Sequence, residues 1–391
     1  MLVCSACGKT YEEESLRWRC PCGAHFSLDK SFFMNQETID NNHHGFWRYH
    51  KALPIDDPDS AVKLGEQFTP LVKHCWNGNN TYFKYEILPT GSYKDRGVAV
   101  MLNRLRELGV KSVHEDSSGN AGASIAGYCA AAGIPCEVIV PESTSRGKCV
   151  QIEAYGATLT KIPGPRSAAS RNAEERGLNT RDKHENVYAS HNWSPYFAHG
   201  VKTWAFEIWE QLVLASSGKA AIDAVVVPAG QGSFLLGAWY AFNELVRGNA
   251  IKRIPRIYAA QGSSCAPLYN AWSMGLTDVP DAEAPAGKCM AEGIVSTHII
   301  RGTELLEAVR CSGGAVFSMD DEKIARALLK LAKAGLYVEP TSAVAAAAID
   351  ELYDSGSVLP GECVVVALSS SGLKTTPYIQ EILDEKEKYE I

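Results

Sequence analysis

The sequence predicts an α/β fold in which helices cover parallel β-sheets and the chain forms two lobes. In the segment 112–162, short apolar runs alternate with helical patterns that end at a glycine. Such repeated strand–helix–strand units build parallel sheets. The continuous apolar run 363–368 is typical of a buried parallel strand. The length of 391 residues favours two lobes, because single cores stop growing near about 250 to 300 residues.

The expected elements follow from these patterns in chain order. The first region should contain strand 112–115, helix 121–132 ending at Gly133, strand 135–140, helix 150–155 ending at Gly156, and strand 157–162. The second region should contain strand 224–227, a glycine-bearing turn, a helix from about Phe234, and strand 257–260. The stretch 280–293 is rich in Pro, Ala and Gly, which predicts a loop.

Composition and charge exclude several classes of partner. The formal net charge is −7 and no segment collects Lys and Arg into a block, so nucleic acid is not expected as a main partner. The chain begins without a basic start or an apolar signal core, and no apolar run is long enough to span a bilayer. Most of the 12 cysteines are scattered, which fits free thiols in a reducing compartment. We therefore expect a cytoplasmic protein.

Lys94 is the first candidate catalytic residue. It lies in the segment Gly-Ser-Tyr-Lys-Asp-Arg-Gly (91–97), where a helical pattern starts that ends at Gly109. The positive end of a helix dipole disfavours the ammonium and favours the neutral amine that forms an imine. Taken alone, the segment fits a surface lysine at a helix start equally well.

Three further turns follow expected strands and have ligand-binding composition. Ser117, Ser118, Gly119, Asn120 and Ala121 open a helix, where backbone amides and hydroxyls hold anions. The glycine-rich turn 228–234 suits a phosphate, although it lacks the lysine of a nucleotide P-loop. The serine-rich turn 369–371 follows the last strand, at the sheet edge where ligands bind. Each turn alone also fits a plain turn or helix cap.

The four elements in this order resemble fold-type II pyridoxal-phosphate enzymes, and in particular the threonine synthase family. The resemblance covers nearly the whole chain and includes Leu64, Gly65, Glu66, Thr69, Pro70, Gly200, Lys202, Glu339, Pro340 and Ser342. It implies that Lys94 is the catalytic, imine-forming lysine. The implied cofactor-binding residues are Lys94, Asn120, Gly230, Gln231, Gly232, Ser233, Phe234 and Ser369, and the implied substrate-binding residues are Ser117, Ser118 and Ala121.

The resemblance also implies a reaction and an assembly. The family consists of lyases of threonine biosynthesis that convert O-phospho-L-homoserine and water to L-threonine and phosphate. The resemblance also implies a homodimer. Two features depart from the family pattern: Ala121 and Gly122 follow Asn120 where hydroxyls are usual, and Phe197 stands where an arginine commonly grips the phosphate. A second hypothesis is therefore a serine or threonine dehydratase that acts on an unphosphorylated hydroxyamino acid.

The N-terminal segment 1–30 carries a separate cysteine pattern. Cys4, Cys7, Cys20 and Cys22 form two close pairs, which predicts a structural zinc site in a small zinc-ribbon-like segment, with free thiols as the alternative. His25 could substitute as a ligand but is expected to face solvent, and His43, His44 and His50 do not make a metal-binding pattern. The predicted lobes are 31–110 with 195–391, and 111–194. A third hypothesis is a non-catalytic binding module, but segment 1–30 has no net charge for nucleic acid.

Overall fold

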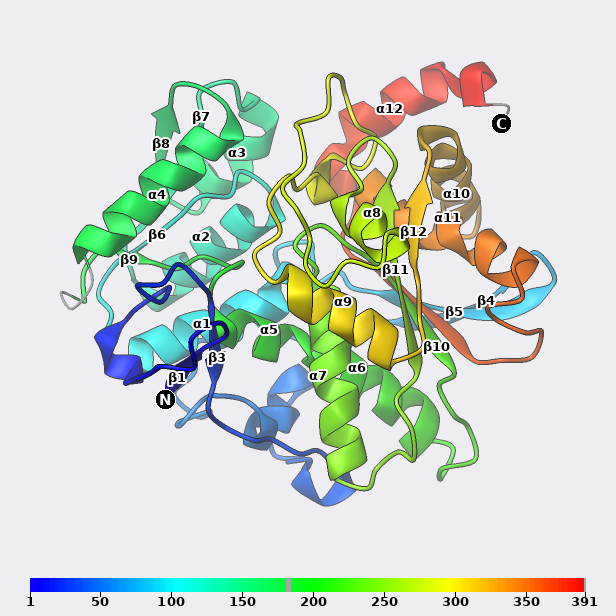
Figure 1. Cartoon of the computed structure of the whole chain (residues 1–391), viewed down its shortest axis with the longest axis horizontal. Coiled ribbons are helices and arrows are strands. Elements are labelled where there is room, and N and C mark those ends of the chain that lie inside the picture. Colours follow the sequence, from blue (N-terminus) through cyan, green and yellow to red (C-terminus); the bar gives the residue numbers. More distant parts are fainter. Residues whose placement is uncertain (181–183, 390–391) are drawn as a thin grey trace. The chain divides into compact units, whose positions relative to one another are not determined.

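The computed structural model describes residues 1–180 and 184–389 of the chain (Figure 1). Contacts divide the chain into two compact units. Unit 1 consists of Met1–Phe33, Glu37–Gln67 and Lys94–Thr203. Unit 2 consists of Met34–Gln36, Phe68–Tyr93 and Trp204–Ile391. The lobe boundaries expected from the sequence stay a prediction.

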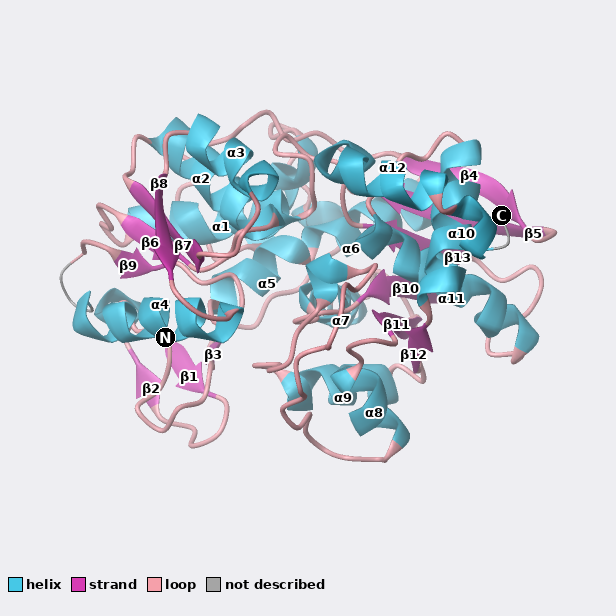
Figure 2. Cartoon of the chain, turned by 90° about the horizontal axis from the view of Figure 1, so that it is seen from above, coloured by secondary structure: helices cyan, strands magenta, loops and turns pink. Residues whose placement is uncertain are grey.

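Unit 1 contains a four-stranded parallel sheet with the strand order β8-β7-β6-β9. The strands are β6 (Val113–Glu115), β7 (Cys136–Pro141), β8 (Thr158–Ile162) and β9 (Val187–Tyr188). Its helices are α2 (Asn120–Ala132), α3 (Arg146–Ala154) and α4 (Arg166–Thr180), and α4 covers the face opposite α2 and α3 (Figure 2). The predicted alternation is confirmed. Helix α3 begins at Arg146, earlier than the expected start at residue 150. The residue before it, Ser145, has an extended backbone.

The rest of unit 1 holds a small antiparallel sheet and four more helices. The sheet has the order β2-β1-β3, with β1 (Leu2–Cys4), β2 (Thr10–Tyr11) and β3 (Phe26–Leu28). The helices are the 3-10 helices η1 (Glu13–Ser15) and η3 (Gly45–Ala52) and the α-helices α1 (Lys94–Glu107) and α5 (Pro195–Val201). A further 3-10 helix, η2, spans Gln36–Thr38. Trp18 anchors the N-terminal segment, because its ring packs edge-on against Tyr188 and Trp193.

Unit 2 contains a six-stranded sheet with the order β12-β11-β10-β13-β5-β4, parallel except for the β4–β5 hairpin. The strands are β4 (Leu71–Trp76), β5 (Asn79–Tyr85), β10 (Ala224–Pro228), β11 (Arg256–Gly262), β12 (Val316–Met319) and β13 (Val364–Leu368). The α-helices are α6 (Thr203–Ile208), α7 (Ser233–Arg247), α8 (Pro267–Ser273), α9 (Gly302–Cys311), α10 (Asp321–Lys333), α11 (Pro340–Asp354) and α12 (Thr376–Asp384). A π-helical turn, η4 (Trp209–Leu214), continues α6, and η5 (Glu292–Ile294), η6 (Gly372–Thr375) and η7 (Lys386–Tyr389) are 3-10 turns.

The central strands of unit 2 are apolar because both of their faces are covered. Val226 and Val366 belong to a core cluster with residues of α10 and α11. Val225 and Val365 are equally buried and, since successive side chains alternate along a strand, they face the opposite side, where α7 packs against β10. The predicted buried strand at 363–368 is therefore confirmed as β13.

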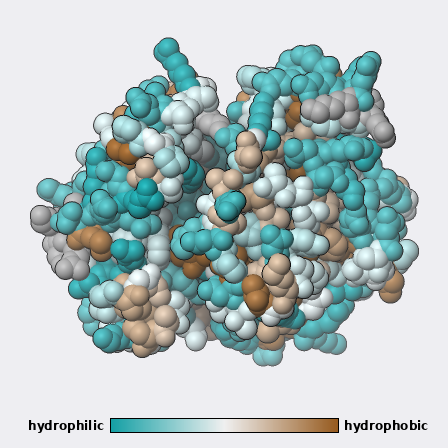
Figure 3. All heavy atoms as spheres, turned by 45° about the horizontal axis from the view of Figure 1, so that its top comes forward, coloured by the Kyte–Doolittle hydropathy of each residue, from teal (hydrophilic) through white to brown (hydrophobic). Residues whose placement is uncertain are grey.

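Among the described residues, none of the helices combines the length and apolar character needed to cross a bilayer. The face drawn in Figure 3 is mostly hydrophilic, with apolar side chains scattered over it. The most exposed large apolar side chains, Leu373 and Met274, lie on different elements of unit 2.

Candidate active site

Lys94 is the first residue of α1, so its amine lies at the positive end of the helix dipole, as predicted. Its Nζ atom is 5.4 Å from the centre of the Phe197 ring on α5. The next residue, Asp95, is fully buried and accepts a 2.6 Å hydrogen bond from the Ser124 hydroxyl on α2. The start of α1 is thus tied to α2, and the amine is held beside an aromatic ring.

Two glycines allow α1 and α5 to pack at this short range. A Cβ atom on Gly97 would lie 2.4 Å from the Phe197 ring. A Cβ atom on Gly200 would lie 2.2 Å from the carbonyl oxygen of Arg96. Both distances are shorter than any real carbon contact, so larger residues would push Phe197 and Lys94 apart.

The turn 117–122 connects β6 to α2 at the carboxyl end of the parallel sheet. Ser117 is buried, and its hydroxyl accepts a hydrogen bond from the Gly119 amide at 3.3 Å. A Cβ atom on Gly122 would lie 1.8 Å from the Ser117 carbonyl, which explains why a small residue follows Ala121. Asn120 is the first residue of α2. This turn therefore presents a helix N-terminus, which is suited to an anion.

A buried Glu115–His191 pair lies within electrostatic reach of Lys94. The Nδ1 atom of His191 is 2.6 Å from Oε1 of Glu115. Burial, followed by the charge of Asp116, raises the pKa of Glu115 well above its usual value. Burial, followed by the charge of Lys94, lowers the pKa of His191 well below its usual value. Both directions favour a neutral pair in which a protonated Glu115 donates to His191.

The glycine-rich turn of unit 2 joins β10 to the 15-residue helix α7. Gly232 has a φ of +76°, and a Cβ atom there would lie 2.3 Å from Leu305. A Cβ atom on Gly230 would lie 3.0 Å from the backbone of Ile294. The turn therefore requires glycines, and its backbone amides begin a long helix.

The side chain of Gln231 has a structural role in the same turn. Its Nε2 atom donates to the Ser296 hydroxyl at 2.6 Å and to the carbonyl of His298 at 2.5 Å. Its Oε1 atom accepts from the Ile300 amide at 3.1 Å. The predicted cofactor binding by Gln231 would therefore use its backbone and not its side chain.

Tyr93 links the two predicted ligand turns of unit 2. Its hydroxyl is 2.7 Å from the Ser233 hydroxyl, and its ring stacks on Phe234 with a centroid distance of 3.8 Å. Its backbone amide donates to the carbonyl of Ser369 at 2.9 Å. The Ser369 hydroxyl in turn is 2.8 Å from the hydroxyl of Ser342 on α11. The turns that follow β10 and β13 thus lie at the same edge of the sheet.

The sequence is similar to a known family over most of its length. The pattern described as "Pyridoxal-phosphate dependent enzyme" matches residues 62–370. The chain is 31% identical to "Threonine synthase" of Methanocaldococcus jannaschii over 385 residues, which cover 95% of this chain and 92% of that protein. It is 30% identical to "Threonine synthase" of Methanosarcina acetivorans, covering 98% and 94% of the two chains. The chain belongs to the pyridoxal-phosphate-dependent enzyme family. The resemblance to threonine synthases is confirmed.

Solved structures of other enzymes share the fold. Maize serine racemase matches with a TM-score of 0.67 and 22% identity, over 83% of this chain and 94% of that one. The processed form of threonine deaminase isoform 2 from Solanum lycopersicum matches with a TM-score of 0.66 and 19% identity, over 93% of each chain. The predicted fold class, that of fold-type II pyridoxal-phosphate enzymes, is confirmed, as is the prediction that the chain is an enzyme.

The residues present fit the cofactor that the family implies. In the turn 230–234, a side chain at Gly232 would collide with Leu305 and one at Gly230 would be tightly packed against Ile294, and the turn ends in a helix N-terminus, which suits a phosphate. Lys94 supplies an amine, and the Ser342–Ser369 hydroxyl pair supplies a neutral partner for a ring nitrogen. Each unit therefore contains groups of the kind that pyridoxal phosphate requires.

Local sequence patterns do not identify four residues of these clusters as functional. Tyr93 is the neighbour of Lys94 in the lysine segment, and Ser342 belongs to the residues that carry the family resemblance. Glu115 and His191 lie 76 positions apart, so no local pattern joins them. One signal was present for Glu115, since this carboxylate ends the strand β6 shortly before Ser117 and Ser118.

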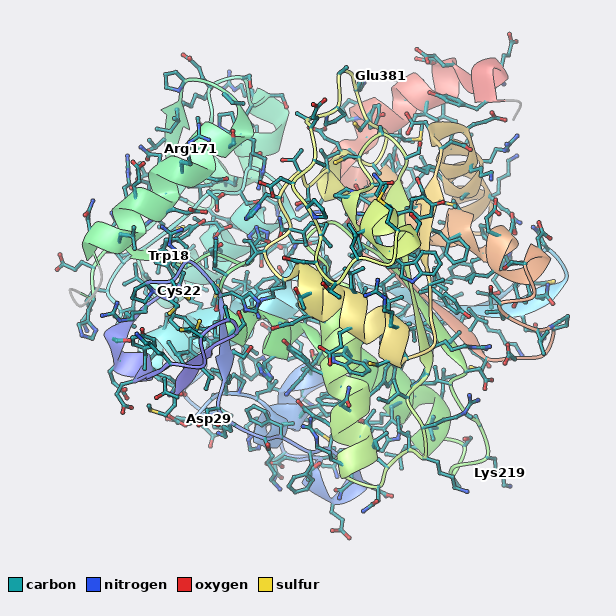
Figure 4. The ribbon with its side chains drawn as sticks, in the orientation of Figure 1. Trp18, Cys22, Asp29, Arg171, Lys219 and Glu381 are labelled. Atoms are coloured by element: carbon teal, nitrogen blue, oxygen red, sulfur yellow. The ribbon has the colours of Figure 1, made fainter. Side chains whose placement is uncertain are left out.

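The four N-terminal cysteines gather as predicted, beside strand β1 of unit 1. All four sulfur atoms lie within 4.8 Å of one another, with 3.4 Å between Cys4 and Cys22 and 3.7 Å between Cys7 and Cys20. Cys22 and Trp18 are labelled on this segment in Figure 4. The expectation for His25 was wrong: only 8% of this residue is exposed, and its carbonyl accepts hydrogen bonds from the amide and the hydroxyl of Ser5.

Glu115→Gln should increase stability more at high pH than at low pH. The raised pKa of Glu115 means that the folded chain keeps a proton that the unfolded chain releases above its usual value of 4.5. Retaining this proton lowers the free energy of unfolding more and more as the pH rises above that value. Glutamine keeps the hydrogen bond to His191 and cannot ionise. Urea unfolding at about pH 4.5 and about pH 8 checks the sign. Glu153→Gln, at an exposed position of α3, is the control; an equal gain at both pH values would contradict the prediction.

Proposed function

We propose that this enzyme is a threonine synthase that converts O-phospho-L-homoserine and water to L-threonine and phosphate. The observation that carries the proposal is the near full-length similarity to two proteins of that name, combined with Lys94 at the start of α1. The substrate is then a small amino acid. The homodimer and the cytoplasmic location stay predictions.

In this proposal the groups of unit 1 bind the substrate and move its protons. The Lys94 amine, at the N-terminus of α1, takes protons from the substrate's α- and β-carbons and returns protons to its γ- and α-carbons, while phosphate leaves the γ-carbon and water adds its hydroxyl at the β-carbon. The amides and hydroxyls of Ser117, Ser118 and Ala121 hold the substrate carboxylate at the N-terminus of α2. Asn120 holds the cofactor's ring hydroxyl. The Phe197 ring limits the positions that the Lys94 side chain can take.

In unit 2 the same proposal assigns cofactor binding to the turns that Tyr93 joins. The backbone of 230–234 and the Ser233 hydroxyl hold the phosphate, and the Ser369 hydroxyl meets the ring nitrogen. When bound, pyridoxal phosphate supplies an electron sink for carbanion chemistry. A neutral hydroxyl leaves the ring nitrogen largely unprotonated, so elimination and replacement are favoured over transamination.

A second candidate function is a dehydratase that acts on an unphosphorylated serine or threonine. The observation that favours it is Phe197, which is 1% exposed and lies beside Lys94. A phenyl ring cannot bind a phosphate as an arginine fork does. The residues Ala121 and Gly122 also lack the hydroxyls that a phosphorylated substrate would use.

Steady-state kinetics on the purified enzyme separates the two functions. Phosphate release from O-phospho-L-homoserine, with equal formation of L-threonine, supports the threonine synthase. Keto-acid formation from L-threonine or L-serine, with no phosphate release at saturating O-phospho-L-homoserine, refutes the threonine synthase and supports the dehydratase.

We also propose that Cys4, Cys7, Cys20 and Cys22 bind a structural zinc ion. Four thiolates at about 2.3 Å from a tetrahedral zinc lie about 3.8 Å apart. The observed sulfur distances of 3.4 Å and 3.7 Å are close to this value, and far longer than a disulfide bond of about 2.05 Å. The Tyr11 hydroxyl, 3.6 Å from the sulfur of Cys20, would donate to one thiolate.

Cys20→Ser should lower the zinc content by one ion per chain and loosen the N-terminal segment. Three thiolates bind zinc far less tightly than four, and the segment is too short to keep its fold without the metal. Elemental analysis of protein prepared without chelators measures the loss. Cys75→Ser, at an exposed position of β4, is the matched control and should leave the zinc content unchanged. Equal zinc in both variants would refute the site.

A further inference from the structure

A second cluster of metal-ligating side chains lies in unit 1, away from the cysteines. Asp40, His43 and His50 each offer one ligand atom, and these atoms lie within 4.8 Å of one another. The Nε2 atom of His50 is 3.1 Å from Oδ2 of Asp40, and the Nε2 atom of His43 is 3.8 Å from the same oxygen. The two imidazoles thus direct the same nitrogen toward one carboxylate oxygen.

The amide of His43 donates to the carbonyl of Asp40 at 3.3 Å, and its ring packs edge-on against the ring of His50. The Nε2 atom of His43 lies between Oδ2 of Asp40 at 3.8 Å and Oδ1 of Asp59 at 3.7 Å, and both distances are too long for a hydrogen bond. Ligands at about 2.0 to 2.1 Å from a tetrahedral zinc ion lie about 3.3 Å apart. The three measured distances, 3.1, 3.7 and 3.8 Å, bracket that spacing.

The backbone holds these side chains in place. The amide of Asp40 donates to the carbonyl of Arg48, and Oδ1 of Asp40 accepts from the Asn42 amide at 3.0 Å, which leaves Oδ2 facing the imidazoles. Gly45 begins η3 with a φ of +56°, and a Cβ atom there would lie 1.9 Å from the carbonyl oxygen of Glu66. The turn before η3 therefore has little freedom to rearrange.

We propose that Asp40, His43 and His50 bind a Zn²⁺ ion, with Asp59 as the fourth ligand. Imidazole nitrogens and carboxylate oxygens are ligands that zinc accepts in tetrahedral sites. The side chains of His43, His50 and Asp40 are 11%, 17% and 22% exposed, so the ion would be partly shielded yet reachable from solvent. The side chain of Asp59 is 89% exposed, with its Oδ1 atom 3.7 Å from Nε2 of His43.

The consequence of the site is structural. The ion joins the turn 40–43 to the last turn of η3 and to the turn around Asp59, a stretch in which 3-10 helix and turns replace longer elements. Binding to the folded chain alone stabilises it in proportion to the logarithm of the zinc concentration.

Isothermal titration of Zn²⁺ into the full-length, tag-free protein tests the proposal, after dialysis against metal-free buffer that leaves the cysteine-bound metal in place. The native chain should bind one further ion. His43→Ala and His50→Ala should each weaken this binding more than about tenfold. His44→Ala is the matched control, because this neighbouring histidine is exposed and outside the cluster, and it should bind as the native chain does.

Asp40→Asn is a further variant in case the alanine variants fold poorly, since asparagine keeps the hydrogen bond from Asn42 and loses the carboxylate charge; it should also weaken binding. Cys20→Ser should leave this event unchanged, which separates it from the cysteine site. No uptake of a further ion by the native chain would overturn the proposal. So would equal binding by the His43, His44 and His50 variants, or loss of the event in Cys20→Ser.

Discussion

Replacing Lys94 by alanine is expected to lower the rate of phosphate release from O-phospho-L-homoserine by about 10⁴-fold or more. Under the proposed function, the variant loses both the amine that bonds the cofactor and the base that moves the substrate's protons. Because the side chain is partly exposed at the start of α1 and Asp95 still anchors the helix to Ser124, the fold should survive. Steady-state kinetics and far-UV circular dichroism measure the two effects separately.

A second readout connects the loss of activity to the covalent bond. Borohydride treatment of the native holoenzyme should bleach its visible absorbance and fix the cofactor to a peptide that contains Lys94. Lys94→Ala should show no fixed cofactor, whereas Lys111→Ala, at an exposed position of unit 1, should match the native enzyme. A cofactor still fixed in Lys94→Ala would assign the role to another lysine.

Phe197 bears on whether the substrate carries a phosphate group. The ring is buried against Gly97, whose missing side chain makes room for it, and it lies beside the Lys94 amine. An apolar ring at this position favours a substrate without a second phosphate group nearby, while the near full-length similarity favours O-phospho-L-homoserine. The kinetic comparison of phosphate release with keto-acid formation therefore decides between two opposing observations.

Local sequence patterns were sufficient to predict the repeated strand–turn–helix units of the fold. The turn at Gly232 could be predicted because a buried strand, a left-handed glycine and a helix start are consecutive in the sequence. The Glu115–His191 pair could not, because its partners are joined only by the packing of the finished sheet. The same holds for Asp40, His43 and His50, whose spacing matches no metal motif and which meet only because the chain turns at Gly45.

A buried ion pair in unit 2 illustrates the same limit. Lys84 on β5 and Glu207 on α6 are 123 positions apart, and both side chains are fully buried with 2.7 Å between Nζ and Oε2. Lys84 also donates to the carbonyl of Thr69 and to the side chain of Gln211, each at 2.8 Å. The Thr69 hydroxyl donates to a second buried carboxylate, Glu86, at 2.6 Å. The Lys84 ammonium thus lies in a buried network that contains the carboxylates of Glu86 and Glu207.

Lys84→Ala should lower the free energy of unfolding by about 3 to 5 kcal/mol, because it leaves the Glu207 carboxylate buried without its cation. Adding Glu207→Gln removes the stranded charge and should recover at least about 1 kcal/mol of that loss. Lys73→Ala, an exposed lysine on the neighbouring strand β4, should change stability by less than about 0.5 kcal/mol. Urea unfolding of the three variants gives these values. If the double variant recovered nothing, the loss would reside in packing, and the charge argument for this network would be wrong.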